Sequence, residues 1–181
     1  MNTSPIPKQQ AHQRRIGMGM IAGAWIVLLG LLTMYFNDWL YDQENPNQQP
    51  LGISMGNGIR EVPLARNRQG HYMATGTING RTARFLLDTG ATTVSVPADL
   101  ARSLRLPIGL AATAWTANGP ITTYDTRLDK VRIGNILLRN VRANINPRMR
   151  SGEVLLGMSF LKRIEFAQQG DTLTLRQSEM K

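Results

Sequence analysis

One tripeptide in this chain of 181 residues has side chains suited to acid–base chemistry. Asp88, Thr89 and Gly90 follow directly after the apolar run Phe85–Leu87. A carboxyl at the end of an apolar strand is expected to lie in a water-poor position, where its proton becomes a reagent instead of a solvated charge. The Thr89 hydroxyl can hold a turn, and Gly90 lets backbone approach closely. The alternative interpretation is an ordinary surface turn capped by an aspartate.

Hydrolysis catalysed by carboxyls alone requires a second carboxyl. The two share one proton, so that one draws a proton from water while the other donates a proton to the substrate. Asp171 is expected in a hairpin turn, Asp99 on a short helix, and Asp125 and Asp129 beside strand residues in contact with solvent. The pair would therefore be completed by Asp88 of another copy, at the axis of a symmetric homodimer.

Other catalytic groups are scarce in the sequence. The chain has no cysteine, which excludes a disulfide framework, a thiolate metal site and a cysteine nucleophile. Its two histidines, His12 and His71, are too few for a histidine-rich metal site. We therefore expect no metal and no cofactor.

Turn signals predict the strands that carry the candidate acid. Asn79-Gly80 is a strong two-residue hairpin signal between the strands Tyr72–Ile78 and Arg81–Leu87. Further hairpins are predicted at Asn118-Gly119 and at Gly134-Asn135. The Phe-Leu-Leu run before Asp88 is expected to be a strand buried on both faces.

Two short helices and further strands complete the predicted domain. Pro97 can open the first helix, and the apolar strand 154–156 runs into a second helix around 159–163. Alternating apolar and polar residues over 140–145 predict a half-buried strand, and the last hairpin turns at Gly170-Asp171. About nine strands in roughly 115 residues indicate a mainly β domain, a closed compact barrel with short helices.

The N-terminal part has the pattern of a membrane anchor. Residues 17–36 are mostly apolar and uncharged, and their length suits a helix that crosses the hydrocarbon core. Tyr35, Trp39 and Tyr41 cluster at the C-terminal end, as in an aromatic belt. A signal peptide cut near residues 22–24 is the alternative, but it would leave most of the apolar run on the mature chain. We expect an uncleaved transmembrane helix.

Basic residues set the expected orientation. Lys8, Arg14 and Arg15 precede the span, and the next basic residue is Arg60, so the N-terminus should stay in the cytoplasm. The rest would lie on the periplasmic side of the inner membrane. All of the net charge of +9 belongs to residues 51–181, on the wrong side of the membrane for nucleic acid.

These patterns divide the chain into five parts. They are the cytoplasmic N-terminus 1–16, the transmembrane helix 17–36, the linker 37–58, the β domain 59–176 and the tail 177–181. The linker is rich in Asn, Gln, Pro and Gly, which predicts a flexible tether. Gly19 and Gly23 form a G-x-x-x-G, a spacing that permits close packing of two membrane helices.

Three segments resemble the retropepsin-like aspartic proteases, in particular their bacterial membrane-anchored members. Leu86–Ala91 resembles the active-site turn of that family. Leu155–Gly157 resembles its second signature, an apolar pair and a glycine that support the active-site loop; the bacterial resemblance extends over 155–161. The hairpin around 116–119 lies where the family places its flap. The resemblance covers about residues 70–176.

The resemblance implies an acid-protease barrel that works as a homodimeric aspartic endopeptidase on an extended peptide. It implies Asp88 as the catalytic residue, with Thr89 and Gly90 supporting the turn. Candidate substrate contacts in the flap are Trp115, Asn118 and Gly119, although Trp115 could equally pack the flap itself.

The sequence departs from the retroviral pattern at Thr92-Thr93 and at Met158, which indicates a different hydrogen-bond network around the active-site loop. Two other functions stay open. One is a dimeric periplasmic module of the same fold that binds peptides or acts as a scaffold without hydrolysis. The other is a basic domain that binds lipid or polyanion, weakens with salt and is indifferent to Asp88.

Overall fold

The computed structural model of the chain describes residues 8–56, 58–116, 119–150 and 152–178. The chain divides into two compact units, Met1–Asp42 and Gln43–Lys181, and each is described by itself. The second unit begins well before residue 59, where the sequence predicted the start of the β domain.

Helix α1 spans Lys8–Glu44, so it extends beyond the predicted membrane segment at both ends. Its stretch Met18–Asn37 is long and apolar enough to cross a membrane, one residue displaced from the predicted span. The side chains described in this stretch are exposed, including those of Trp25 and Tyr35. A run of exposed large apolar side chains of this kind is typical of a membrane or protein contact surface.

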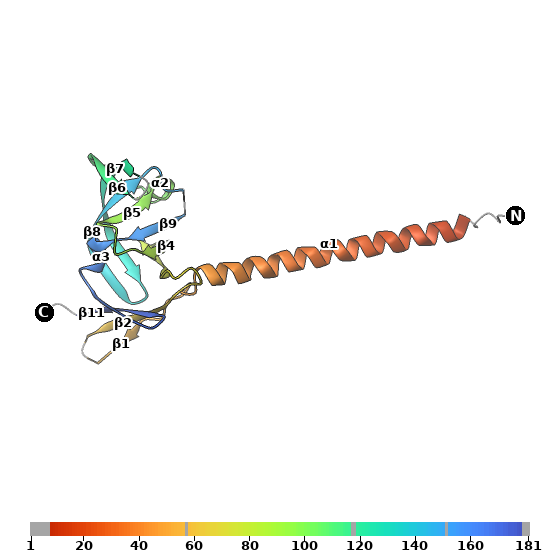
Figure 1. Ribbon diagram of the computed structural model, residues 1–181, viewed down its shortest axis with the longest axis horizontal. Helices are drawn as coiled ribbons and strands as arrows, with labels where there is room; N and C mark the ends of the chain where they lie inside the picture. Colours follow the sequence, from red (N-terminus) through yellow and green to blue (C-terminus); the bar gives the residue numbers. More distant parts are fainter. Residues whose placement is uncertain (1–7, 57, 117–118, 151, 179–181) are drawn as a thin grey trace. The chain divides into compact units, whose positions relative to one another are not determined.

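The second unit is built mainly from strands (Figure 1). In chain order its elements are β1 (Ile53–Ser54), β2 (Arg60–Ala65), β3 (Met73–Ile78), β4 (Arg81–Leu87), β5 (Val94–Pro97), α2 (Ala98–Ser103), β6 (Ala111–Thr116), β7 (Gly119–Ile133), β8 (Ile136–Asn146), β9 (Glu153–Leu156), α3 (Met158–Leu161), β10 (Glu165–Gln169) and β11 (Thr172–Gln177).

The strands form two sheets. The larger has the order β3-β4-β9-β5-β8-β7-β6, and the smaller has the order β1-β2-β11-β10. Strands β3 and β7 also pair, but only at two positions, where Thr77 lies opposite Arg132 and Ile78 lies opposite Val131. The predicted mainly β architecture is confirmed, whereas the barrel is not formally closed.

The predicted hairpin turns are confirmed by their backbone geometry. Asn79 and Gly80 have φ values of 51° and 86°, the two positive angles that a type I′ turn requires, and they join β3 to β4. Gly134 (φ 54°) turns β7 into β8, and Gly170 (φ 58°) turns β10 into β11. The turn chemistry therefore fixed the register of three strand pairs.

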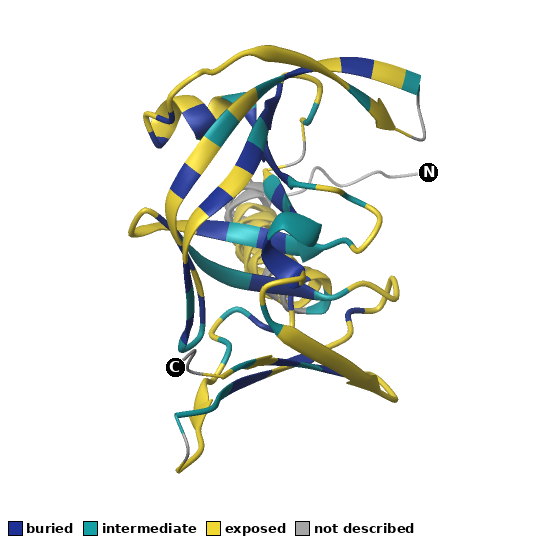
Figure 2. Cartoon of the chain, turned by 90° about the vertical axis from the view of Figure 1, so that its left-hand side faces the viewer, coloured by how far each residue is buried: buried dark blue, intermediate teal, exposed yellow. Residues whose placement is uncertain are grey.

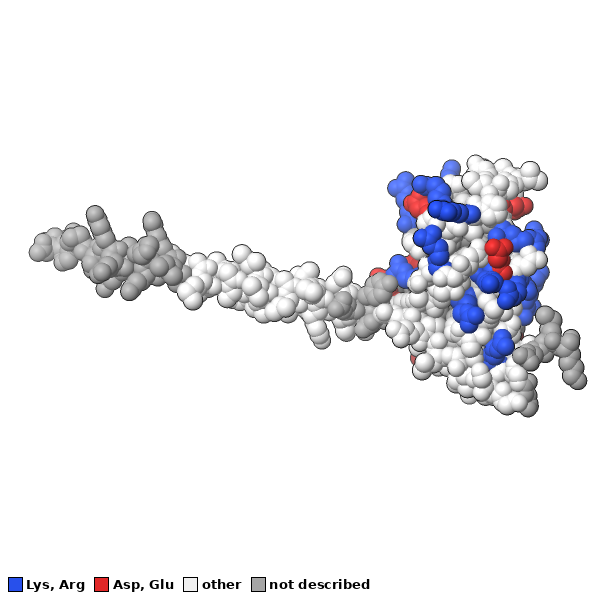
Figure 3. Space-filling view, turned by 180° about the vertical axis from the view of Figure 1, so that it is seen from behind, with Lys and Arg blue, Asp and Glu red and all other residues white. Residues whose placement is uncertain are grey.

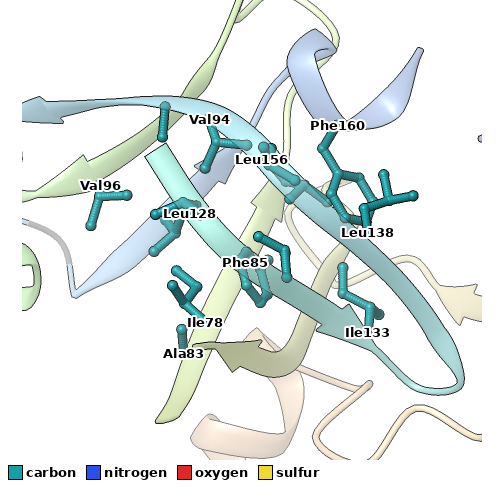
Figure 4. Close-up of a cluster of buried hydrophobic side chains, with 14 of the residues drawn as sticks. Ile78, Ala83, Phe85, Val94, Val96, Leu128, Ile133, Leu138, Leu156 and Phe160 are labelled. Carbon is teal, nitrogen blue, oxygen red and sulfur yellow. The ribbon is translucent and has the colours of Figure 1, made fainter. Parts of the chain in front are cut away.

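One apolar core cluster joins the larger sheet, strands β2 and β11 of the smaller sheet and both short helices, and Figure 4 shows part of it. Phe85, Leu128, Leu156 and Phe160 are fully or almost fully buried, and their side chains come from β4, β7, β9 and α3. Burial of this kind alternates with exposure along the long strands, as Figure 2 shows. The strand that precedes Asp88 is thus anchored at Phe85.

The predicted linker differs most from the structure. Asn45 and Asn47 are buried, and the Asn47 Nδ2 donates to the carbonyl oxygens of Met73 (2.6 Å) and Ala65 (2.9 Å). The Ala65 amide in turn donates to Asn47 Oδ1 at 2.8 Å. Composition alone does not distinguish an asparagine that bonds buried backbone groups from one in a flexible loop. The prediction of a flexible tether is therefore wrong at Asn45 and Asn47.

Candidate active site

The candidate acid follows the strand that lies beside the second signature. Strands β4 and β9 are parallel, with Leu86 opposite Leu155 and Leu87 opposite Leu156. The Asp88 amide donates to the Leu156 carbonyl oxygen at 3.3 Å, which carries the pairing one residue past the end of β4. The two segments that resemble protease signatures are therefore neighbours in the sheet.

The Asp88 carboxylate is oriented by its own turn. Its Oδ1 accepts a hydrogen bond from the Gly90 amide at 2.9 Å, and its carbonyl oxygen accepts one from Ala91 at 3.3 Å. A Cβ at position 90 would lie 3.2 Å from that Oδ1, so glycine suits this position. Thr89 and Gly90 are exposed.

The carboxyl is less buried than the sequence predicted. Asp88 is half-buried, and so are Leu86 and Leu87, whereas Phe85 is fully buried. The expectation of a strand buried on both faces is therefore wrong beyond Phe85. In a single copy of the chain, the turn is open to solvent at Thr89 and Gly90.

Gly157, in the second signature, allows the backbone of residues 91–93 to pack directly against it. A Cβ at this position would lie 2.3 Å from the Thr93 carbonyl oxygen and 2.6 Å from that of Ala91, both backbone atoms. Helix α3 begins just after it, and the Met158 amide donates to the Ala91 carbonyl oxygen at 2.8 Å. The Ser159 amide donates to that of Thr92 at 3.0 Å. Residues 91 and 92 thus cap the start of α3.

A polar network continues beyond these backbone bonds. The Ser159 hydroxyl donates to the Arg142 carbonyl oxygen (2.7 Å) and accepts from the Val94 amide (3.0 Å). Asn144 Nδ2 donates to Thr93 Oγ1, and the Ser95 hydroxyl donates to Asn144 Oδ1, both at 2.7 Å. The sequence indicates the departure at Thr92-Thr93, but it gives no sign of the partners of these residues, Asn144 on β8 and Ser159 on α3. No local pattern links residues so distant in the chain.

The flap candidates lie on an exposed hairpin. Trp115 on β6 is 82% exposed, and Gly119 begins β7 with φ at 95°. The Thr116 hydroxyl donates to the Gly119 carbonyl oxygen at 2.8 Å. Asn118 lies outside the described residues. The hairpin is where the sequence predicted it, with longer strands on both sides.

A groove separates this hairpin from the active-site turn. It has a volume of about 430 Å³, and its lining includes Gly90–Thr93 on one side and Ala112–Thr116 on the other. Asp125 is the one charged residue among the described lining residues. Figure 3 shows Lys and Arg side chains spread over one face of the β domain.

Asp88 itself lines a second hollow next to the groove. This hollow measures about 310 Å³ and is bordered by Tyr72, Thr89, Phe166 and Gln168 as well as by Asp88. The active-site turn therefore lies between two concave surfaces.

The other aspartates are placed as predicted. Asp99 and Asp171 are exposed and pair with Arg102 and Arg66 respectively, the second at 2.8 Å. Asp125 and Asp129 are exposed on β7. Among the described residues, no cluster of three His, Asp or Glu side chains could hold a metal ion.

Comparisons with known proteins agree with this geometry. Residues 74–163 match the family model described as "gag-polyprotein putative aspartyl protease". The chain is 30% identical over 180 residues to the "Uncharacterized protein in cobV 5'region" of Sinorhizobium sp., a match that covers 93% of this chain and 77% of that protein. It is 27% identical over 111 residues to the "Uncharacterized protein RP867" of Rickettsia prowazekii, a match that covers 59% of this chain and 47% of that protein.

A solved structure extends the likeness to the fold. The crystal structure of a retropepsin-like aspartic protease from Rickettsia conorii superimposes with a TM-score of 0.58 at 29% sequence identity. The match covers 65% of this chain and 91% of that one. With the turn of Asp88 seated on β9 and α3, the chain belongs to the retropepsin-like aspartic proteases.

Proposed function

We propose that this protein is a membrane-anchored aspartic endopeptidase that acts as a homodimer. The observation that carries the proposal is the position of Asp88, whose carboxylate is held by the Gly90 amide in a turn braced by β9 and α3. The exposed part of that turn suits a second copy. Thr89 and Gly90 support the turn.

The proposed reaction needs only the two Asp88 carboxyls and water. One ionised carboxylate takes a proton from the water as its oxygen attacks the peptide carbonyl carbon, while the protonated partner donates to the carbonyl oxygen. The tetrahedral intermediate then loses its C–N bond, and the amine nitrogen leaves with a proton from the dyad. The product acid and amine together contain the atoms of peptide and water.

The groove beneath the flap is proposed to hold the substrate. An extended peptide would lie between residues 90–93 and the β6–β7 hairpin, where main-chain bonds to strand edges can hold it. Trp115 and Gly119 are proposed to contact it, and Asn118 is proposed with them from the sequence alone.

Replacement of the acid tests the catalytic assignment. The full-length chain in detergent micelles is assayed against a peptide library from about pH 3 to about pH 8, and Asp88→Asn is expected to lower cleavage at least about 100-fold. Asp129→Asn, exposed on β7 and outside the groove lining, is the matched control and should cleave nearly as well as wild type. Wild-type cleavage by Asp88→Asn would contradict the proposal, and peptide binding without turnover by wild type would favour the non-catalytic module.

A mixing experiment tests the need for two copies of Asp88. If wild-type and Asp88→Asn chains are co-expressed in equal amounts, random pairing leaves about one quarter of the dimers with two intact carboxyls. Activity should fall to that level. Activity at half of wild type would indicate that each chain works alone.

The anchor and its orientation are proposed from the apolar stretch Met18–Asn37 and the basic residues before it. The chain has no cysteine, so a single cysteine at exposed Ser103 can be labelled selectively. A membrane-impermeant maleimide should label it in spheroplasts if the β domain is periplasmic. Protection until the membrane is broken would reverse the orientation.

A further inference from the structure

Strands β7 and β8 place like charges directly opposite each other on the protein surface. Arg127 lies opposite Arg142, and Lys130 lies opposite Arg139. All four side chains are exposed. Directly opposite residues of an antiparallel pair lie close together, and like charges in these positions weaken the pairing. The two strands therefore carry a surface whose charges repel one another.

An irregularity between the two pairs brings all four side chains to the outer face. Residues 127 and 130 are three positions apart, so a regular strand would direct them to opposite faces. The register has no pair between Asp129 and Asn140, and Asn140 has φ at 55°. The residues that flank these exposed positions on the two strands are buried: Leu128, Val131, Leu138 and Val141. The alternation is thus reset at this point, and both charged pairs face away from the core.

A fifth cation joins this surface from the segment after α3. Arg163 is exposed, and its Nη1 donates to the Arg139 carbonyl oxygen at 2.8 Å. Arg127 Nη1 donates to Asn140 Oδ1 at 2.7 Å, so two guanidinium groups are held beside residues 139 and 140. We call five residues the basic strip: Arg127, Lys130, Arg139, Arg142 and Arg163.

The basic strip lacks compensating acids. In the described part of the chain, the arginines that form ion pairs all lie outside the strip: Arg66, Arg84, Arg102 and Arg176. Asp129 is exposed between Arg127 and Lys130 in the sequence, yet it pairs with neither in the described structure. Residues 127–142 contain five basic residues and one acidic residue, a net charge of +4. Cations gathered in this way create a positive potential that favours a bound anion.

Two arginines of the strip also line a polar hollow. Arg127 and Arg142 border it together with Asp125 and Thr126, and its volume is about 300 Å³. The Asp125 carboxylate forms no ion pair with either arginine among the described residues. Guanidinium groups bind phosphate oxygens in a planar, bidentate geometry. Phosphate groups carried by a larger structure therefore suit this surface.

The membrane anchor determines which phosphates are near the strip. The apolar stretch ends at Asn37, and the second unit of the chain begins at Gln43. The five residues between them cover at most about 20 Å even when fully extended. Asn45 and Asn47 are buried, so the segment after Gln43 does not lengthen this connection. A short tether gives the headgroups of the same bilayer a high effective concentration at the β domain.

We infer that the basic strip binds anionic phospholipid headgroups of the bilayer that holds α1. Each Lys or Arg that reaches an anionic bilayer surface strengthens binding about fivefold. Binding would also relieve the repulsion between the opposed pairs of β7 and β8. The inference rests on the membrane anchor of the proposed function and is independent of Asp88.

Arginine labelling in lipid nanodiscs tests the binding. The full-length wild-type chain is placed in nanodiscs of phosphatidylcholine, with or without about one third phosphatidylglycerol, and is treated with phenylglyoxal. Mass spectrometry of its peptides should show that anionic lipid slows labelling of Arg127, Arg139 and Arg142 at least about fivefold, a ratio called protection below. Arg102 and Arg148, exposed and outside the strip, should change less than about twofold. Salt at about 0.5 M should remove the difference. Equal labelling in the two kinds of nanodisc, or equal protection of all five arginines, overturns the inference.

Removal of two charges tests the strip against the rest of the surface. The double variant Arg127→Gln with Arg142→Gln should lower the protection of Arg139 at least about fourfold. The double variant Arg102→Gln with Arg148→Gln removes the same charge outside the strip and should leave that protection unchanged. Cooperative urea unfolding in detergent micelles verifies that both variants are folded. Undiminished protection of Arg139 in the first variant, or an equal loss in the second, would contradict the role of the strip.

Further outcomes separate this inference from the protease proposal. Asp88→Asn should keep the protection of the strip. Protection by heparin in neutral nanodiscs, with none from anionic lipid, would assign the strip to a soluble polyanion and overturn the inference. If the chain does not elute with the nanodiscs, the anchor is wrong and the inference fails with it.

The two proposals can also fail singly. If cleavage depends on Asp88 but anionic lipid gives no protection, the lipid surface is wrong and the protease proposal survives. If the strip is protected but wild type cleaves no peptide, the lipid surface stands and the protease proposal fails.

Discussion

The active-site turn and the flap hairpin face the same groove but are held very differently. Residues 88–93 are tied to β9, α3 and β8 by backbone and side-chain hydrogen bonds, and Gly157 lies against them without room for a methyl group. The β6 strand of the hairpin is exposed except for partly buried Ala114, and it pairs only with β7. The fold thus holds the turn of Asp88 more firmly than the hairpin, since regions with few buried contacts open at low free-energy cost.

The largest loss of stability is expected from a substitution at Gly157, beside the active-site turn. Gly157→Ala places a methyl group against the carbonyl oxygens of Ala91 and Thr93, and backbone cannot move aside cheaply, so we expect a loss of about 3 kcal/mol or more. Urea unfolding of the full-length chain, followed by circular dichroism, measures it. Gly152→Ala is the control, since its Cβ would meet only Arg84 Nη2 at 3.8 Å. Equal stability of the two variants would contradict the rigid-turn interpretation.

Removal of one hydroxyl tests the polar network behind the turn. Ser159→Ala leaves the Val94 amide and the Arg142 carbonyl oxygen without their partner, which should cost about 1–3 kcal/mol in the same unfolding experiment. Ser103→Ala removes an exposed hydroxyl bonded to the Leu100 carbonyl oxygen and should cost less than about 0.5 kcal/mol. If Ser159→Ala lowered the free energy of unfolding less than Ser103→Ala, the polar network would not stabilise the turn.

Replacement of Gly119 in the hairpin should lower the free energy of unfolding less than replacement of Gly157. Gly119 has φ at 95°, a conformation that strains an alanine, but nothing lies within 4 Å of its Cβ position. Gly119→Ala is therefore expected to lose about 1 kcal/mol, through backbone strain alone. A loss as large as that of Gly157→Ala would mean that the flap is as tightly held as the turn.

The smallest effect on stability is expected at the flap tryptophan. Trp115 is 82% exposed, so Trp115→Ala should change the free energy of unfolding by less than about 0.5 kcal/mol. If Trp115 contacts substrate, kcat/KM should fall about tenfold, mostly through KM. Thr122→Ala, exposed on β7 and outside the groove lining, is the control. Unchanged kinetics would assign Trp115 to the flap alone.

Local patterns were sufficient to predict much of the larger sheet. Asn79-Gly80 and Gly134-Asn135 specify their turns by positive φ, so the strand pairs on either side followed from sequence. The position of Asp88 at the end of a strand followed in the same way. The smaller sheet was less predictable, because the pairing of β2 with β11 joins residues as distant as Glu61 and Arg176.

The environment of the site could be predicted only in part. Gly157 was recognised by resemblance, but its role depends on how closely the carbonyl oxygens of Ala91 and Thr93 approach it. The half-buried state of Asp88 differs from the prediction because the apolar run is fully buried only at Phe85, while Leu86 and Leu87 are themselves half-buried. Asn47 was missed because its bonding partners, Ala65 and Met73, give no signal in the sequence.

The pairing of β2 with β11 also has a consequence for biosynthesis. Arg176 donates to Glu61 Oε1 across 115 positions of sequence, and β2 finds its main partner in the last strand of the domain. Contacts of such long range slow folding, because a large loop must close before they form. Until β11 has been synthesised, the two-residue strand β1 is the one strand partner described for β2 that is already present. The domain can therefore complete its smaller sheet only after β11 has been synthesised.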